Sequence, residues 1–158
     1  MTQRHPLNVR LDSNRASNPI TYNVDVTLLN GPYLYLGSPI PLKVQLTATH
    51  GTRFSVWLND FQTLLLGEAE FRAGGLTERD TQVHIIQTMT NIRYNVYNSD
   101  SSSERAICIG ENLWNNHRVP DTAMPSFETC NINQSYKLDV RLGFQSGISK
   151  VCNVRKTT

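Results

Sequence analysis

Apolar and polar residues alternate with a period of two along most of the chain. In the segment 23–28, Val24, Val26 and Leu28 fall on one side of an extended strand, and the polar residues between them fall on the other. The same alternation recurs four times, in the segments 42–48, 54–58, 92–96 and 136–144. A strand with one apolar face must cover that face with another layer, so this pattern predicts a sandwich of β-sheets.

Two further patterns refine this fold. The run 61–67 is more densely apolar, which predicts a central strand buried on both sides. Turns rich in glycine and proline, at 30–33, 37–41 and 73–75, separate the expected strands. No segment carries a sustained helical stripe, so we expect an all-β fold of two mainly antiparallel sheets.

The length of 158 residues lies in the usual range of a single domain. We divide it into an N-terminal arm (1–18), a β-sandwich domain (19–147) and a basic C-terminal tail (148–158). The arm contains one strand-like segment, 7–11, which we expect to form an edge strand around Val9.

Composition and charge exclude several classes of function. Fifteen Lys and Arg residues against thirteen Asp and Glu residues give a net charge of +2, which is too small and too scattered for a nucleic-acid-binding surface. No run approaches the ~20 apolar residues of a membrane helix, so we expect a protein that is peripheral to membranes rather than inserted. Cys108, Cys130 and Cys152 match neither a zinc site nor a disulfide framework, which favours a reducing, cytoplasmic location.

The sequence contains no signature of catalysis. There is no Gly-x-Ser-x-Gly motif, and the four histidines are isolated from one another and from carboxylates at ligand spacing. Glu68 and Glu70 would lie on one strand face. We interpret this pair as part of a solvated surface rather than as a catalytic acid and base. We therefore expect a protein that is not an enzyme, with no catalytic residue, cofactor or metal site.

The candidate binding residues are basic side chains and one strand edge. Arg72 and Arg79 flank the turn at 73–75, and with Arg93 they could form a small anion-binding patch for a phosphorylated partner. The edge strand around Val9 could instead accept a partner by strand addition.

Three segments together resemble fungal arrestin-like proteins. They are NGPYLYLGSPIPL at 30–42, LLLGEAEFRAGGL at 64–76 and PSFETCNINQSYKLDV at 125–140. The third is the most specific, because Pro-Ser-Phe precedes a strand that contains Tyr136. The order and the spacing of the three segments also agree with that family, and the resemblance extends over about residues 18–144.

This resemblance implies an immunoglobulin-like β-sandwich of the arrestin N-terminal type. It implies a non-catalytic adaptor that recognises cytoplasmic tails of membrane proteins in trafficking, endocytosis or ubiquitin-linked regulation, recruited from the cytoplasm to the plasma membrane or endosomes. The chain contains no Pro-Pro-x-Tyr motif, so contact with ubiquitin-ligase machinery would pass through a second protein. The family continues with an apolar strand where this chain has its basic C-terminal segment, as expected of a truncated or divergent member.

Two other functions remain open at this point. The sandwich could be a structural subunit that assembles through its strand edges. It could also bind carbohydrate, with Trp57, Trp114 and the tyrosines as platforms for sugar rings.

Overall fold

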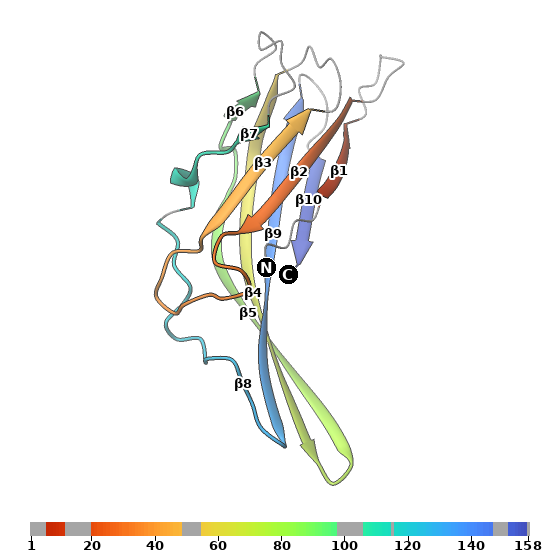
Figure 1. Ribbon diagram of the computed structural model, residues 1–158, viewed down its shortest axis with the longest axis vertical. Coiled ribbons are helices and arrows are strands. Elements are labelled where there is room, and N and C mark those ends of the chain that lie inside the picture. The colour runs from red at the N-terminus through yellow and green to blue at the C-terminus, as the bar shows by residue number, and fades with distance from the viewer. Residues whose placement is uncertain are drawn as a thin grey trace.

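Figure 1 shows the computed structural model of the chain, which describes residues 6–11, 20–48, 55–97, 106–114, 116–146 and 152–157. Two β-sheets account for most of these residues, and a short 3₁₀ turn, η1 (Glu111–Leu113), lies between β7 and β8. Every strand pair is antiparallel. The prediction of an all-β sandwich with antiparallel sheets is therefore confirmed.

The first sheet contains four strands in the order β1-β2-β3-β7. Their bounds are β1 Pro6–Leu11, β2 Ile20–Leu28, β3 Leu42–Ala48 and β7 Ile107–Cys108. The alternating segments at 23–28 and 42–48 thus form strands, as predicted, and the structure makes these two strands neighbours. Strand β1 covers the expected strand at 7–11. Among the described residues it pairs only with β2, so it lies at an edge of this sheet.

The second sheet contains six strands, four of them in the order β10-β9-β4-β5. β6 pairs with β4, and β8 pairs with β9. The bounds are β4 Val56–Ala73, β5 Leu76–Met89, β6 Tyr94–Tyr97, β8 Phe127–Glu128, β9 Ile132–Ser146 and β10 Cys152–Thr157.

Strand β4 is the central strand of this sheet, as the dense apolar run at 61–67 predicts. It pairs with β9 on one side and with β5 and β6 on the other. The sequence pattern separates this run from the alternation at 54–58, whereas the structure joins them from Val56 onward; Phe54 lies outside the described residues. A register shift between Leu58 and Asp60 brings both Leu58 and Phe61 into the core although they are three residues apart.

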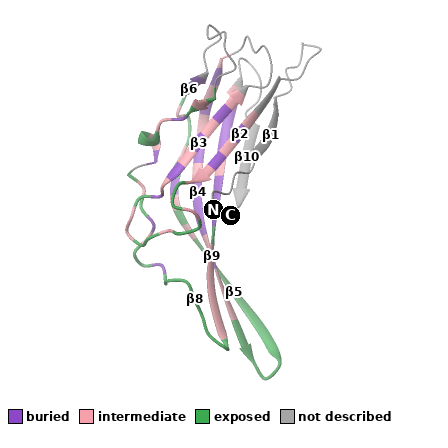
Figure 2. Ribbon diagram, in the orientation of Figure 1, coloured by how far each residue is buried: buried purple, intermediate pink, exposed green. Residues whose placement is uncertain are grey.

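The two sheets bury one apolar core between them. Figure 2 shows the buried residues concentrated where the sheets overlap. The alternating residues of the predicted strands supply most of this core: Val24 and Val26 from β2, Leu42, Val44 and Leu46 from β3, Val56, Leu58, Phe61 and Leu65 from β4, and Leu138, Val140, Leu142 and Phe144 from β9.

The irregular segment that follows β7 closes one side of the core. Trp114 is 2% exposed, and its ring stacks on Phe61 with 5.2 Å between the ring centroids. Its indole Nε1 donates a hydrogen bond of 2.7 Å to the backbone oxygen of Leu42. Because Trp114 is a core residue, it is not accessible to a sugar ring.

The C-terminal segment 148–158, expected to be a basic tail, contains strand β10. β10 pairs with β9 from Cys152 opposite Phe144 to Thr157 opposite Asp139. It is the outermost strand on that side of the second sheet and lies beside β1 of the first sheet (Figure 1).

Candidate functional site

The second sheet continues beyond the sandwich as a projecting arm. The arm consists of residues 68–83 of the β4–β5 hairpin and residues 132–137 of β9. In Figure 1 it occupies the lower end of the molecule, and in Figure 2 it contains no buried residue. Since the described residues provide no second layer for the arm, its cohesion comes from backbone pairing and from side-chain pairs across the strands.

A two-glycine turn closes the arm at its tip. Ala73 pairs with Leu76, and between them Gly74 and Gly75 have φ angles of +57° and +80°. A two-residue hairpin turn with positive φ at both central positions strongly favours glycine there. The turn predicted at 73–75 is therefore confirmed, and its residue types explain why the hairpin reverses at this point.

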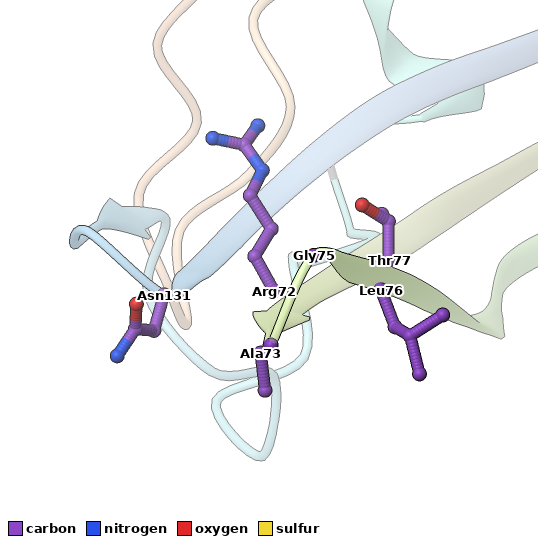
Figure 3. Close-up of a pocket in the computed structure, with 7 residues that line it drawn as sticks. Arg72, Ala73, Gly75, Leu76, Thr77 and Asn131 are labelled. Atoms are coloured by element: carbon purple, nitrogen blue, oxygen red, sulfur yellow. The ribbon is translucent and has the colours of Figure 1, made fainter.

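The tip of the arm carries a shallow pocket that is open to solvent. It is lined by exposed residues from the turn, from the strand ends beside it and from Asn131. Figure 3 shows Arg72 and Thr77 pointing to one side of the hairpin, and Ala73 and Leu76 pointing to the other. With no buried polar group in its lining, this pocket lacks the enclosed and polar features of a small-molecule site.

A cluster of ion pairs occupies one face of the arm. Arg72 Nε donates a hydrogen bond of 2.7 Å to Glu70 Oε1, and Arg79 Nη2 lies 3.0 Å from Glu70 Oε2. Glu68 lies 3.7 Å from the charged nitrogens of both Arg79 and Lys137. The hydrogen bond from Arg72, followed by its charge and by Arg79, keeps the pKa of Glu70 below its ordinary value, although partial burial opposes this effect.

In this cluster, the two arginines of the predicted anion patch are already paired with a carboxylate of the chain. The structure brings Arg72 and Arg79 together, but it does so through the carboxylate of Glu70 that lies between them. The whole arm contains four carboxylates and three basic side chains, so its net charge is −1. An anionic partner would have to compete with Glu70 for both guanidinium groups.

The other two predicted binding residues lie elsewhere. Arg93 is exposed in the turn between β5 and β6, where its φ is +52°. About 30 Å of strand separates Arg79 from Met89, just before that turn, at ~3.3 Å per residue. Val9 lies in β1, opposite Tyr22, at the edge of the first sheet. The structure therefore does not unite the three arginines in one patch, and it does place Val9 at a strand edge.

The structure also reveals a second strand edge that the sequence interpretation missed. β5 is the last strand of its sheet along the arm, with β4 as its one neighbour there among the described residues. On one face of β5, Val83 and Ile85 are 58% and 67% exposed. On the other face, Glu78 and Asp80 are exposed, and neither forms an ion pair in the described ranges.

A sequence signal for this edge did exist. The segment around His84 alternates, with Val83 and Ile85 on one face and Gln82 and His84 on the other. Alternation alone does not reveal which face is covered, because that depends on the side from which the opposite sheet packs. Here the core residue Leu65 pairs with His84. Val83 and Ile85 lie on the opposite face of β5, which points away from the first sheet, and they remain in solvent.

The described residues offer no obvious reaction centre. Among them, no three His, Cys, Asp or Glu side chains are grouped as metal ligands would be. Cys108 and Cys130 are exposed free thiols. Within the same residues, no helix has the length and apolar character needed to cross a membrane.

No protein-family model matches this chain, and no curated protein matches it. The resemblance of three segments to arrestin-like proteins therefore enters only as part of a proposal.

Proposed function

We propose that this chain is a non-catalytic protein-binding module, an arrestin-like adaptor that recognises cytoplasmic segments of membrane proteins. The observation that carries the proposal is the projecting arm, whose edge strand β5 exposes backbone groups and apolar side chains together. The resemblance of the segments at 30–42, 64–76 and 125–140 supports the arrestin type of sandwich and a role in trafficking, endocytosis or ubiquitin-linked regulation.

Strand addition is the binding mode that this edge favours. The outer N–H and C=O groups of an edge strand are satisfied by water, and an extended peptide can replace that water with a ladder of hydrogen bonds. Val83 and Ile85 would lose their exposed apolar surface in the same event. Backbone pairing and apolar burial therefore act on the same partner segment.

Edge strand β1 is the second candidate surface. It lies at the end of the first sheet, and its neighbour in that sheet is β2. Strand addition at β1, around Val9, is the mode expected from the sequence. The two edges belong to different sheets, so a binding experiment can distinguish them.

Hydrogen–deuterium exchange tests the proposal directly. The protein is mixed with extended peptides from cytoplasmic tails of membrane proteins, and protection is compared between β5 and β1. Bound peptide should slow exchange of the outward backbone amides of one edge strand. Val83→Glu should weaken binding at β5, whereas Leu29→Glu, which alters an apolar residue exposed on the sandwich body, should not. Absence of binding and of protection at both edges would contradict the proposal.

Recognition of phosphate remains a separate prediction, and Glu70 provides its test. Glu70→Gln removes the carboxylate that holds Arg72 and Arg79. If these arginines bind phosphate, the variant should bind a phosphorylated tail peptide more tightly while its affinity for the unmodified peptide stays constant. Arg93→Gln would show whether the distant arginine contributes. Equal affinity for both peptides in every protein would eliminate the anion patch.

The alternative of an assembly subunit uses the same edges but a different partner. A sandwich that assembles through β1 or β5 would form a stable oligomer at micromolar concentration, which sedimentation or mass photometry measures. The carbohydrate alternative loses Trp114 to the core and retains Trp57, which is half-buried, and the exposed Tyr33 and Tyr35.

A further inference from the structure

The two faces of β5 carry different chemistry along the arm. One face presents Val83 and Ile85, which lie beside Leu66 and Leu64 of β4 in the strand register. These four side chains form an apolar strip that reaches the edge of the sheet. The opposite face presents Glu78 and Asp80, which lie beside Phe71 and Ala69 of β4.

The register of this stretch is regular. The shift in the β4–β5 pairing occurs at Thr63 and Leu64, which places the irregularity on β5 beyond Ile85. From Glu78 to Ile85, side chains therefore alternate strictly between the two faces. A strand added to this edge would follow the same alternation, because paired residues project to the same face of a sheet.

Resting on the proposed binding function, we infer that the β5 edge selects an extended segment with apolar residues on one face and basic residues on the other. The apolar residues lie opposite Val83 and Ile85 and extend the strip that begins at Leu64 and Leu66. The basic residues lie opposite Glu78 and Asp80, whose carboxylates have no ion pair in the described part of the chain.

The partner pattern follows from the spacing along β5. In an antiparallel partner, the residue opposite Ile85 comes first and the residue opposite Val83 comes two positions later. The residues opposite Asp80 and Glu78 then occupy the sixth and eighth positions. A partner therefore has apolar residues at positions one and three and lysine or arginine at positions six and eight, and a parallel partner has the reverse order.

The basic side chains have a second contact available. Phe71, the β4 neighbour of Glu78, is 42% exposed on the face that the basic residues would occupy. A lysine or arginine opposite Glu78 can lay its aliphatic stem along this ring and bring its charge to the carboxylate. The arm thus offers both charge and apolar surface to a basic side chain.

A second copy of this chain is a poor occupant of the same edge. In a two-fold antiparallel pair centred on Asp80, that residue would face its own copy. Centring the pair on Arg79 places Glu78 opposite Asp80 of the second copy. Pairing Val83 with Ile85 of the second copy matches the apolar residues but leaves Asp80 opposite Thr88. No such register matches the acidic and the apolar residues together, which favours a different, basic partner.

The test uses labelled eight-residue peptides with the antiparallel and the parallel pattern, measured by fluorescence anisotropy against the full chain. The control peptide has the same composition, with its two lysines moved by one position to the face of Val83. The in-phase peptide is the one whose two lysines lie on the face of Glu78 and Asp80. We expect it to bind about five- to tenfold more tightly than the control, since it forms two opposite-charge pairs across the strands. Equal affinities of the in-phase and control peptides would overturn the inference.

A charge reversal makes the test specific for the two carboxylates. The double variant Glu78→Lys with Asp80→Lys should lose its preference for the lysine peptide and gain a preference for a peptide with glutamate at positions six and eight. Both residues are exposed in the arm, and circular dichroism would check that the variant retains the sheet. Failure of this exchange of preference would overturn the inference.

Hydrogen exchange separates this inference from the proposed function. If peptides protect β5 without regard to phase or charge, or protect β1 instead, the module binds strands but the inferred selectivity is wrong. If no peptide protects either edge, the proposed binding function is wrong as well.

Discussion

Replacing Gly67 with alanine places a methyl group against the ring of Tyr136, where the sandwich body gives way to the arm. Gly67 is buried in β4, opposite Tyr136 of β9 and Gln82 of β5. A Cβ atom on Gly67 would lie 2.8 Å from Tyr136 Cε1, whereas ordinary contacts of this kind are 3.4–4 Å. The ring packs against the core, so it has little freedom to move away.

The expected cost follows from two opposing effects. Overpacking a tightly filled site costs about 1–3 kcal/mol. Alanine also reduces the conformational entropy of the unfolded chain, which returns about 0.4–1 kcal/mol where the backbone suits it. We expect Gly67→Ala to lower the free energy of unfolding by about 1–2 kcal/mol, and the Tm by about 3–6 °C for a chain of this size.

Urea unfolding followed by circular dichroism measures this loss, provided that the slope of the transition stays constant. The matched control is the same substitution in a Tyr136→Ala background, where the added methyl group meets no ring. There Gly67→Ala should be neutral or slightly stabilising, which gives a coupling between the two sites of about 1.5 kcal/mol. An equal loss in both backgrounds would refute the reasoning, because the clash with the ring would then not be its cause.

Three further predictions concern single side chains. Trp114→Phe should lower the free energy of unfolding by about 2–4 kcal/mol in urea, because it removes the hydrogen bond to the buried oxygen of Leu42 and leaves a cavity. Thr63→Val should raise stability by about 1 kcal/mol in the same assay, since the buried Thr63 Oγ1 has no hydrogen-bond partner among the residues that the structure describes. Glu70→Gln should destabilise the protein slightly at pH 7, and by less at pH 3. The depressed pKa of Glu70, due first to Arg72, gives stability that is present above the ordinary pKa of 4.5 and is lost as the pH falls through the folded-state value.

Each of these outcomes can fail clearly. A loss below about 1 kcal/mol for Trp114→Phe would mean that the hydrogen bond and stacking contribute little. A loss of stability in Thr63→Val would show that the hydroxyl has a partner after all. If Glu70→Gln lowers the free energy of unfolding by the same amount at pH 7 and at pH 3, the ion-pair cluster is not the cause of the loss.

The period-two pattern determined where most strands lie, because alternation is a property of neighbouring residues. The segments around Val24, Val44 and Val140 each form a strand whose apolar residues are buried. The turn at 73–75 was also local, since two glycines with positive φ specify a tight reversal by themselves.

The joining of two sequence patterns into the single strand β4 required the tertiary structure. From sequence, Leu58 and Phe61 belong to different patterns, because Phe61 comes three positions after Leu58, whereas alternation puts residues of one face an even number of positions apart. The register shift between Leu58 and Asp60 reconciles them, and the position of that shift depends on pairing with β9. A shift of this kind is a property of two strands, so one strand's sequence does not reveal it.

The candidate site also divides in this way. Sequence alone placed Arg72 and Arg79 near the same turn and put Glu68 and Glu70 on one strand face, but cross-strand pairing decided that Glu70 lies between the two arginines. Likewise, Val83 and Val140 occupy similar alternating patterns, yet Val140 is buried and Val83 is exposed. Alternation gives each strand two distinct faces, and only the tertiary structure decides which of them the opposite sheet covers. Val140 lies on the face that packs against the first sheet, whereas Val83 lies on the face that points away from it.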